Sequence, residues 1–289
     1  LVDGALHLRA YEQLSTQAVF AHGAQPTQKL AQQIRAYCAR HLQGEAPAAV
    51  SIGFPSTINR ARTVVLQTPN IEGIPDNYAV VQELGGELGL PVYINRDVNN
   101  LLLFDLEDLG LTDCGCVTAI YFGTGLGNAV MLGQKLLLGY HGAAAELGHL
   151  PVYGNRHVCK CGNPSCLETV VSGLALEGIQ AEHFPQTPIH QLFARHMGTA
   201  VMQDFLVGMA QVVALEINLF DPDCMVLGGG LLQMEGFPCK QLEALVHRYA
   251  RKPYPERDLR LRYSRPNQEN GPVGAAIYAC KRMADPQYL

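Results

Sequence analysis

The strongest constraint on the fold is an alternation of helical patterns with short, almost charge-free runs typical of buried strands. Residues 26–42 carry apolar side chains at helical spacing and precede the run AAVSIGF. Residues 76–90 form a second helical pattern and precede PVYINRD at 91–97, from which another helix is expected at 98–109. Continuous apolar runs of this kind are typical of parallel strands covered on both faces. The alternation predicts an α/β protein with ligand loops at the carboxyl ends of its strands.

The second half of the chain continues this pattern without a low-complexity linker. Its first segment, GCVTAIYFGTGLGNAVMLG at 115–133, is long enough for a membrane helix, but its internal glycines and β-forming residues predict strand, glycine turn and strand. No membrane span is therefore expected. A long helix, a strand, a helix, a strand and a final helix are predicted at 199–220, 225–230, 237–250, 259–264 and 271–283.

The chain opens on LVDGALHLRAY, which predicts two short strands joined by a type I′ turn at Asp3 and Gly4. The first of these strands would hold only two residues. We therefore expect that the sequence starts part-way through a protein and that an earlier strand precedes it.

Composition narrows the function classes. With 289 residues and 48% hydrophobic content, the chain can bury the core of one large or two medium domains. Its net charge is −5 and it has no basic run, so a nucleic-acid partner is not expected. The odd count of nine cysteines and the lack of a signal-peptide pattern indicate reduced thiols and a cytoplasmic location.

The sharpest local signal is the cysteine-rich segment HVCKCGNPSC at 157–166, which follows the tetrapeptide ELGH. Its cysteines, Cys159, Cys161 and Cys166, are soft ligands separated by a tight Gly-Asn-Pro turn. With one histidine they supply the Cys₃His set of a closed structural zinc site. Either His149 or His157 can be the fourth ligand. The alternative is a set of buried free thiols, or a disulfide with one thiol left over.

Two glycine clusters follow apolar strands, FGTGLG at 122–127 and GGG at 228–230. Glycine lets backbone amides approach phosphate oxygens closely, although each cluster alone could be only a tight turn. The first cluster is neither a dinucleotide fingerprint nor a Walker loop, because a strand follows it and it lacks GK[ST]. Two such turns at the ends of buried strands favour nucleotide binding.

A third element is Asn95-Arg96-Asp97 at the end of a very apolar strand. Asp97 can be a helix N-cap, or a general base in the crevice where α/β sheets bind ligands. Asn70, Glu146 and Glu168 are further polar residues in apolar or glycine-rich surroundings, and such groups suit a site that binds several sugar hydroxyls.

Together these motifs resemble the ROK family of sugar kinases and repressors, and the similarity covers most of the chain. Within the family the chain is most similar to the D-allose kinases. The resemblance is carried by GFP at 53–55, Asp97 with the Val-Asn-Asn after it, FGTGLG at 122–127, AAELGH at 144–149, CKCGNPSCLE at 159–168 and INLFDPDCMVLGGG at 217–230.

The resemblance implies an actin-like, ribonuclease-H-like α/β fold in which two domains close on a cleft. The expected domains are a sugar-binding domain at 1–112, joined by the C-terminal helix at 271–289, and a domain at 113–270 with the zinc motif and the nucleotide loops. The implied activity is ATP-dependent phosphorylation of the 6-hydroxyl of a free hexose, D-allose above others, by a cytoplasmic homodimer. ATP, Mg²⁺ and a structural Zn²⁺ are the implied cofactors.

The resemblance also assigns roles to individual residues. Asp97 would be the general base that takes the proton of the sugar hydroxyl as it attacks the γ-phosphate. The sugar-binding residues would be Gly53, Asn70, Arg96, Asp97, Glu146, His149 and Glu168. The nucleotide would meet Gly123, Thr124, Gly125, Gly127, Gly228, Gly229 and Gly230. Zinc would be held by His149, Cys159, Cys161 and Cys166, with no open position.

Several features depart from the family pattern. Arg96 stands where glucokinase-like members have Asn, which disfavours glucose, and Ser56 and Ala145 stand where the family usually has Gly. The family's opening Asp-x-Gly-Gly-Thr loop is expected about ten residues before Leu1. The alternatives are a kinase for glucose, fructose, mannose or N-acetylmannosamine, a sugar-binding pseudoenzyme, and a sugar-sensing repressor with a helix-turn-helix domain before residue 1.

Overall fold

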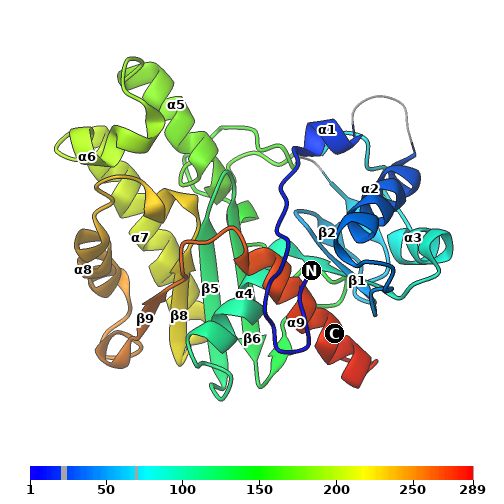
Figure 1. Ribbon diagram of the computed structural model, residues 1–289. Helices are drawn as coiled ribbons and strands as arrows, with labels where there is room; N and C mark the ends of the chain where they lie inside the picture. Colours follow the sequence, from blue (N-terminus) through cyan, green and yellow to red (C-terminus); the bar gives the residue numbers. More distant parts are fainter. Residues whose placement is uncertain (21–24, 69–70, 289) are drawn as a thin grey trace. The chain divides into compact units, whose positions relative to one another are not determined.

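The computed structural model describes residues 1–20, 25–68 and 71–288 (Figure 1). The chain divides into two compact units. Unit 1 comprises Leu1–Leu106, Leu138–Ala144 and Asn267–Leu289, and unit 2 comprises Glu107–Leu137 and Ala145–Pro266. The first boundary therefore lies at residue 106 rather than 112, and residues 138–144, expected in the second domain, belong to unit 1.

The centre of unit 1 is a parallel pair of strands, β1 (Val50–Phe54) and β4 (Val92–Arg96), in register from Val50 opposite Val92 to Phe54 opposite Arg96. Both strands were predicted from their apolar runs. A short antiparallel pair, β2 (Thr57–Ile58) and β3 (Val65–Gln67), lies between them in the sequence.

Among the described residues, five helices accompany these strands: α1 (Thr16–Phe20), α2 (Pro26–His41), α3 (Val80–Leu88), α4 (Asp97–Asp108) and α9 (Asn270–Ala284). Helix α9 packs on β1 and β4, and α2 packs on α3. Helix α3 is shorter than the predicted 76–90, because Tyr78 pairs with Val65 of β3 through two backbone hydrogen bonds. Gly89 ends α3 with a left-handed φ of 68°.

The N-terminal segment forms a hairpin, but its turn differs from the predicted type I′ turn. Neither Asp3 nor Gly4 has a positive φ; the left-handed residue is Leu6, with φ 63°. The Asp3 carboxylate accepts the amides of Ala5 and His7 at 3.0 Å each, so an Asx-type turn replaces the two-residue loop. The strands meet in one bridge, between Val2 and Leu8.

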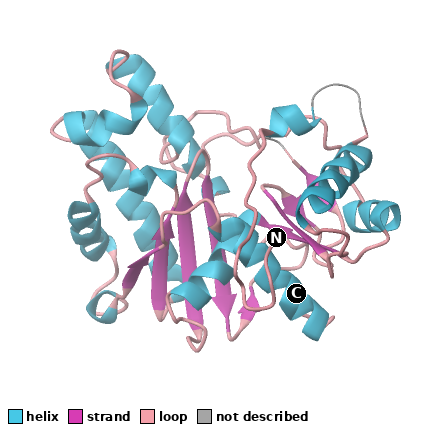
Figure 2. Cartoon of the chain, in the orientation of Figure 1, coloured by secondary structure: helices cyan, strands magenta, loops and turns pink. Residues whose placement is uncertain are grey.

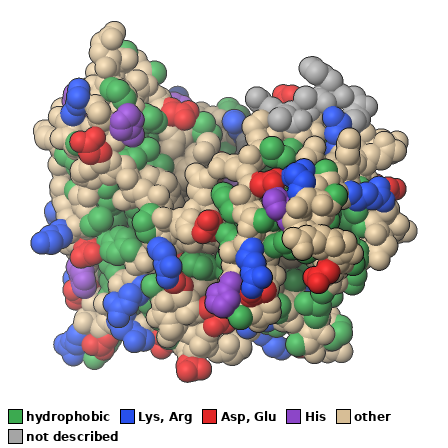
Figure 3. Space-filling model, viewed as in Figure 1, with side chains coloured by type: hydrophobic (Ala, Val, Ile, Leu, Met, Phe, Trp, Pro, Cys, Tyr) green, Lys and Arg blue, Asp and Glu red, His purple; other side chains and the backbone are tan. Residues whose placement is uncertain are grey.

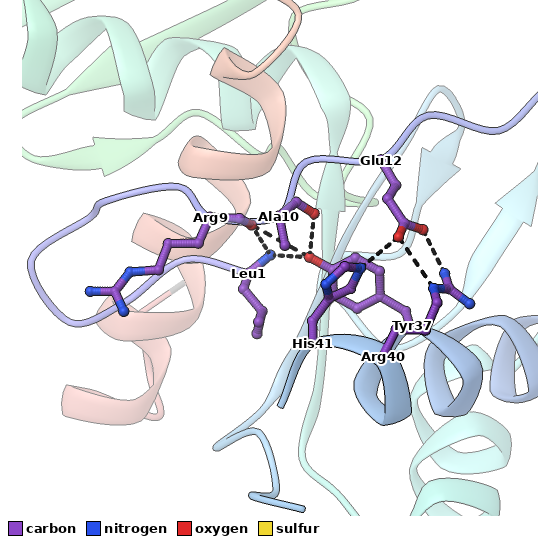
Figure 4. Close-up of polar contacts among 7 residues, drawn as sticks. All are labelled: Leu1, Arg9, Ala10, Glu12, Tyr37, Arg40 and His41. Atoms are coloured by element: carbon purple, nitrogen blue, oxygen red, sulfur yellow. Dashed lines mark hydrogen bonds and ion pairs between the residues drawn. The ribbon is translucent and has the colours of Figure 1, made fainter. Parts of the chain in front are cut away.

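This segment is attached to α2 by polar contacts (Figure 4). The Leu1 ammonium group donates to the Tyr37 hydroxyl at 2.7 Å, and that hydroxyl donates to the carbonyl of Ala10 at 2.7 Å. Glu12 pairs with Arg40 and His41, at 2.6 Å each. Beside these contacts, a groove of about 560 Å³ is lined by residues of β1, α2, α9 and the N-terminal segment. The expectation of an earlier strand stays a prediction.

Unit 2 is built on a five-stranded mixed sheet in the order β7-β6-β5-β8-β9 (Figure 2). Strands β5 (Cys116–Phe122) and β6 (Leu126–Leu132) form the predicted antiparallel pair across the glycine turn. Strand β8 (Cys224–Gly228) is parallel to β5, and β9 (Leu261–Tyr263) is parallel to β8. Strand β7 (Lys135–Leu136) pairs antiparallel with β6.

The helices of unit 2 are α5 (Gly173–His183), α6 (Leu192–His196), α7 (Ala200–Phe220) and α8 (Cys239–Tyr249). In the described ranges, α7 alone is long and apolar enough to cross a membrane. It is the central core helix of unit 2, where it contacts β5 and α8 and buries ten residues. Helices α5 and α6 were not predicted; Ser172 caps α5 by accepting the Ala175 amide.

Five short 3₁₀ helices complete the part of the chain that the structure describes. They are η1 (Leu147–His149), η2 (Leu167–Thr169), η3 (Ile189–Gln191), η4 (Gly230–Gln233) and η5 (Glu256–Asp258). On the face drawn in Figure 3, basic side chains are interspersed with acidic ones, in keeping with the modest net charge of −5.

Candidate active site and metal centre

The turn between β5 and β6 is held by the start of α5. Within the turn, the Gly123 amide donates to the Gly125 carbonyl at 3.1 Å. The carbonyls of Gly123 and Thr124 accept the amides of Gly173 and Leu174 at 2.8 and 3.0 Å. A Cβ on Gly173 would lie 2.7 Å from the Gly123 oxygen, so this close approach requires glycine. The turn therefore has a fixed backbone with little room at its base.

Glu168 of η2 lies against the same turn. Its Oε2 accepts the Leu126 amide at 2.9 Å, and a Cβ on Gly125 would come within 2.4 Å of that oxygen. Its Oε1 lies 3.8 Å from Cys159 Sγ. The carboxylate is thus fixed between the glycine turn and the cysteine-rich segment. Gly127, also assigned to the nucleotide, lies within β6 opposite Tyr121.

Three thiols and one imidazole converge beside Glu168. The ligand atoms of His149, Cys159, Cys161 and Cys166 all lie within 4.8 Å of one another. Cys161 Sγ is 3.7 Å from Cys166 Sγ, and Cys159 Sγ is 3.7 Å from His149 Nδ1. A disulfide needs about 2.05 Å, whereas a tetrahedron with metal–sulfur bonds of about 2.3 Å has edges of about 3.8 Å. The donor set and its spacing fit a four-coordinate zinc ion.

The burial of two of the thiols, Cys159 and Cys166, also favours a bound cation. Burial raises the pKa of the Cys159 thiol, and it raises the pKa of Cys166 to about 12. Burial disfavours the charged thiolate form, and three thiolates could share this corner only with a cation between them. Soft thiolate ligands select zinc among the common divalent cations.

The two candidate histidines lie differently. His149 Nδ1 faces the cysteines, while His157 is exposed and lies outside the four-residue group. The other ring nitrogen of His149, Nε2, is 3.9 Å from Glu146 Oε2, and the His149 amide donates to the Glu146 carbonyl at 3.0 Å. A carboxylate facing the second nitrogen of a metal-binding histidine is a common arrangement in metal sites. Glu146, His149 and Glu168 are therefore gathered in one part of unit 2.

The second glycine cluster is shaped by packing against β5. A Cβ on Gly228 would lie 2.7 Å from a ring carbon of Tyr121. Gly229 has a φ of 97°, and a Cβ there would lie 2.4 Å from the Phe122 carbonyl oxygen. Gly230 faces open space and begins η4. The first two glycines are thus required by the close approach of two strand ends, whatever ligand binds there.

In unit 1, Asp97 is the first residue of α4 and directly follows β4. Its Oδ1 accepts the Val98 amide at 2.8 Å, which orients the carboxylate. Arg96 is only 7% exposed, and its Nη1 donates to the Ala144 carbonyl at 3.0 Å. The guanidinium therefore does not extend into solvent.

Polar side chains hold the end of β4 in place. Asn95 is fully buried, and its Oδ1 accepts the Arg96 amide at 2.9 Å and Asn99 Nδ2 at 3.0 Å. A Cβ on Gly53 would lie 2.9 Å from Asn100 Nδ2 and 3.3 Å from Asp97 Cα. Gly53 thus allows β1 to pass close beside the first turn of α4.

One predicted site residue, Asn70, lies outside the described residues. Two polar residues that the sequence analysis did not assign to the site, Asn128 and Glu216, lie in the core of unit 2, each 1% exposed. The signal that could have found them is a polar side chain inside a strongly apolar strand or helix, since such a group requires a buried partner.

The family model named ROK matches residues 2–282. A glucokinase of Thermotoga maritima is 30% identical over 210 residues, which cover 65% of each chain. The chain spans 55% to 66% of the length of the first curated relatives that it matches.

Solved structures share the fold. The crystal structure of a ROK family glucokinase from Streptomyces griseus in complex with glucose and AMPPNP has a TM-score of 0.77 at 24% identity, covering 97% of this chain and 94% of that one. The crystal structure of a ROK family transcriptional regulator, a homologue of the E. coli MLC protein, has a TM-score of 0.73 at 26% identity. The match covers 87% of this chain and 67% of that one. The expected actin-like α/β fold is thereby confirmed.

Proposed function

The chain belongs to the ROK family, and we propose that it is an ATP-dependent kinase that phosphorylates the 6-hydroxyl of a free hexose, D-allose in preference to others. The observation that carries this proposal is the place of Asp97, at the junction of β4 and the N-terminus of α4. In α/β folds, ligands bind at the carboxyl ends of the strands. A carboxylate oriented at this point can act as a general base.

In this proposal the 6-hydroxyl oxygen of the hexose attacks the γ-phosphorus of ATP. Asp97 accepts the hydroxyl proton as the bond from the γ-phosphorus to the β,γ-bridging oxygen breaks and ADP leaves. The Val98 amide keeps Asp97 Oδ1 in one orientation. The glycines at 123–127 and 228–230 are assigned to ATP, and Mg²⁺ bound with the nucleotide would supply charge stabilisation.

By resemblance to the family, the sugar hydroxyls are assigned to Gly53, Asn70, Arg96, Asp97, Glu146, His149 and Glu168. The carboxylates accept hydrogen bonds from hydroxyls, and the Arg96 guanidinium donates them. D-allose and D-glucose differ only in configuration at carbon 3, so one donor aimed at that hydroxyl can separate them. The burial of Arg96 against the Ala144 carbonyl supports a role inside the site rather than on the surface.

The Cys₃His group is assigned to one zinc ion, with His149, Cys159, Cys161 and Cys166 as its ligands. Four protein ligands leave no open position, so the ion would stabilise the segment without taking part in the chemistry. It would hold His149 and, through the short chain from Cys166, Glu168.

A second candidate function is a sugar-sensing transcriptional repressor. The observation that favours it is the likeness to a ROK family transcriptional regulator, which exceeds this chain in length, since 67% of that chain is covered. Such a protein would bind the hexose through the same residues and would not turn over ATP.

The test is an ADP-release assay with the full-length protein, ATP and Mg²⁺. The substrates are D-allose, glucose, fructose, mannose and N-acetylmannosamine, and we expect the highest kcat/KM with D-allose. Turnover fastest with another hexose would overturn the assigned specificity. Hexose binding without turnover would favour the repressor.

The role of Asp97 is tested by Asp97→Asn, whose amide oxygen can still accept the Val98 amide. Loss of the base should lower kcat by about 10²–10⁴-fold and spare hexose binding. The exposed Asp113→Asn is the matched control and should keep full activity. Wild-type kcat in Asp97→Asn would remove the assigned role.

A further inference from the structure

Asn128 and Glu216 form a buried polar pair in the core of unit 2. Asn128 lies in β6 and Glu216 in α7, and each is 1% exposed. Asn128 Nδ2 donates to Glu216 Oε1 at 3.1 Å. Burying a carboxylate in an apolar core costs free energy unless a hydrogen-bond donor satisfies it. Packing alone therefore does not explain why Glu216 lies here.

The pair determines which way the Asn128 amide points. Where Glu216 is ionised, its carboxylate only accepts hydrogen bonds, so the NH₂ group of Asn128 faces it. The amide oxygen then points the other way, where Oδ1 accepts the Leu147 amide at 2.9 Å. Leu147 is 3% exposed, so water does not replace this acceptor.

The Leu147 amide belongs to η1, the three-residue turn between Glu146 and the zinc-facing side chain of His149. The next residue, Gly148, is also set against β6, since a Cβ there would lie 2.4 Å from the Leu126 carbonyl oxygen. Both contacts fix η1 to the same strand. The Asn128 contact is the one that depends on a side chain and can be altered by substitution.

We infer that Asn128 and Glu216 are positioning residues, which orient η1 and thereby the side chains of Glu146 and His149. The consequence for hexose binding rests on the proposed function. The consequence for the backbone of η1 does not, because it follows from the hydrogen bonds alone.

Charge on Glu216 strengthens the bond to Asn128. Burial raises the pKa of Glu216 to about 7, while the hydrogen bond from Asn128 acts in the opposite direction. Glu216 also acts on the Cys116 thiol, whose pKa is raised to about 11 by burial and by the charges of Asp223, Glu216 and Asp221, so this thiol is neutral at pH 7. Above pH 7, Glu216 is therefore an ionised acceptor facing Asn128.

This chemistry predicts the outcome of exchanging donor and acceptor. In Asn128→Asp, two carboxyl groups face each other; a shared proton can join them below pH 7, and repulsion separates them at pH 8.5. In the double variant Asn128→Asp/Glu216→Gln, the glutamine NH₂ donates to one aspartate oxygen, and the other oxygen accepts the Leu147 amide. Glu216→Gln alone keeps an acceptor for Asn128.

The experiment measures two properties of the full-length protein at pH 6 and 8.5. The first is hydrogen exchange of the peptide containing Leu147, and the second is KM and kcat for the best hexose. At pH 8.5 we expect Asn128→Asp to exchange faster and to raise KM by about tenfold with a smaller change in kcat. Glu216→Gln and the double variant should match wild type within about twofold.

If Asn128→Asp does not fold, the double variant still tests the inference. Its folding and its KM can return to the wild-type values only if the exchanged hydrogen bond forms. A double variant as impaired as Asn128→Asp would overturn the inference, as would unchanged exchange at Leu147 in Asn128→Asp. If the exchange data follow expectation and the wild-type protein phosphorylates no hexose, the proposed function fails and the positioning pair stands.

Discussion

The contact between α9 and α4 in unit 1 gives a sharp prediction about stability. A Cβ built on Gly274 lies 1.8 Å from the Asn100 carbonyl oxygen, whereas Cβ contacts under 3.0 Å essentially never occur in real structures. In Gly274→Ala the two helices must move apart by about 1.2 Å, the difference between those distances. Both partners are backbone atoms of helices, so no side chain can rotate away to relieve the clash.

The expected cost is at the upper end of overpacking, about 3 kcal/mol in the free energy of unfolding. Gly86→Ala is the matched control, because Gly86 lies within α3 of the same unit and its Cβ would meet nothing within 4 Å. Alanine at position 86 should raise the free energy of unfolding by about 0.5–1 kcal/mol. Urea unfolding followed by circular dichroism measures both.

The same variant should also affect activity. Asn100 lies in the first turn of α4, and its side chain limits the space at Gly53 beside Asp97. A displaced α4 would therefore shift the proposed base and lower kcat. If Gly274→Ala were as stable as Gly86→Ala and fully active, the argument from close helix contact would be refuted.

Three further predictions concern other parts of the chain. Protein purified without chelator should carry one zinc ion, which Cys161→Ser should lose and the exposed Cys280→Ser should keep in elemental analysis; a full zinc content in Cys161→Ser would contradict the assigned ligand set. Burial raises the pKa of Glu216 from 4.5 to about 7, so the folded protein holds a proton that the unfolded chain releases, and stability falls as pH rises through that window. Relative to wild type, Glu216→Gln should gain roughly 3 kcal/mol in urea unfolding between pH 4 and pH 8, and identical pH profiles would exclude this. Ala145 has a left-handed φ of 60°, so Ala145→Gly should raise the unfolding free energy by about 1 kcal/mol, and a loss of stability would show that the strain is absent.

Strands whose residues are buried on both faces could be predicted from the sequence. The apolar runs that became β4, β5 and β6 are mostly buried, and such runs predict strands without knowledge of distant residues. The run that became β1 was predicted in the same way, although its residues at 50–52 are half-buried and Gly53 is exposed. The place of Asp97 follows in the same way, since it ends one such run and begins a helix. Local periodicity likewise predicted α7.

Contacts between distant residues could not be predicted. Asn128 and Glu216 are 88 residues apart in the sequence. The residues around either one do not indicate that the two side chains form a hydrogen bond. The choice between His149 and His157 depends on the path of the backbone, which turns at Gly162 with φ 93° and at Ser165 with φ 68°. The cysteine spacing is compatible with either histidine. The N-terminal turn depends on a carboxylate that binds two amides, which a Gly-based turn rule overlooks.

The position of α7 in the core has a consequence for the order of events during synthesis. The hairpin of β5 and β6 is local, and it can form once the ribosome has released residue 132. Strand β8 pairs with β5 across 107 residues, and its Met225 and Leu227 share the core with α7. Until β8 emerges, the nascent chain presents a 21-residue apolar helix that lacks part of its binding surface. Apolar surface exposed in this way is prone to aggregation until β8 covers it.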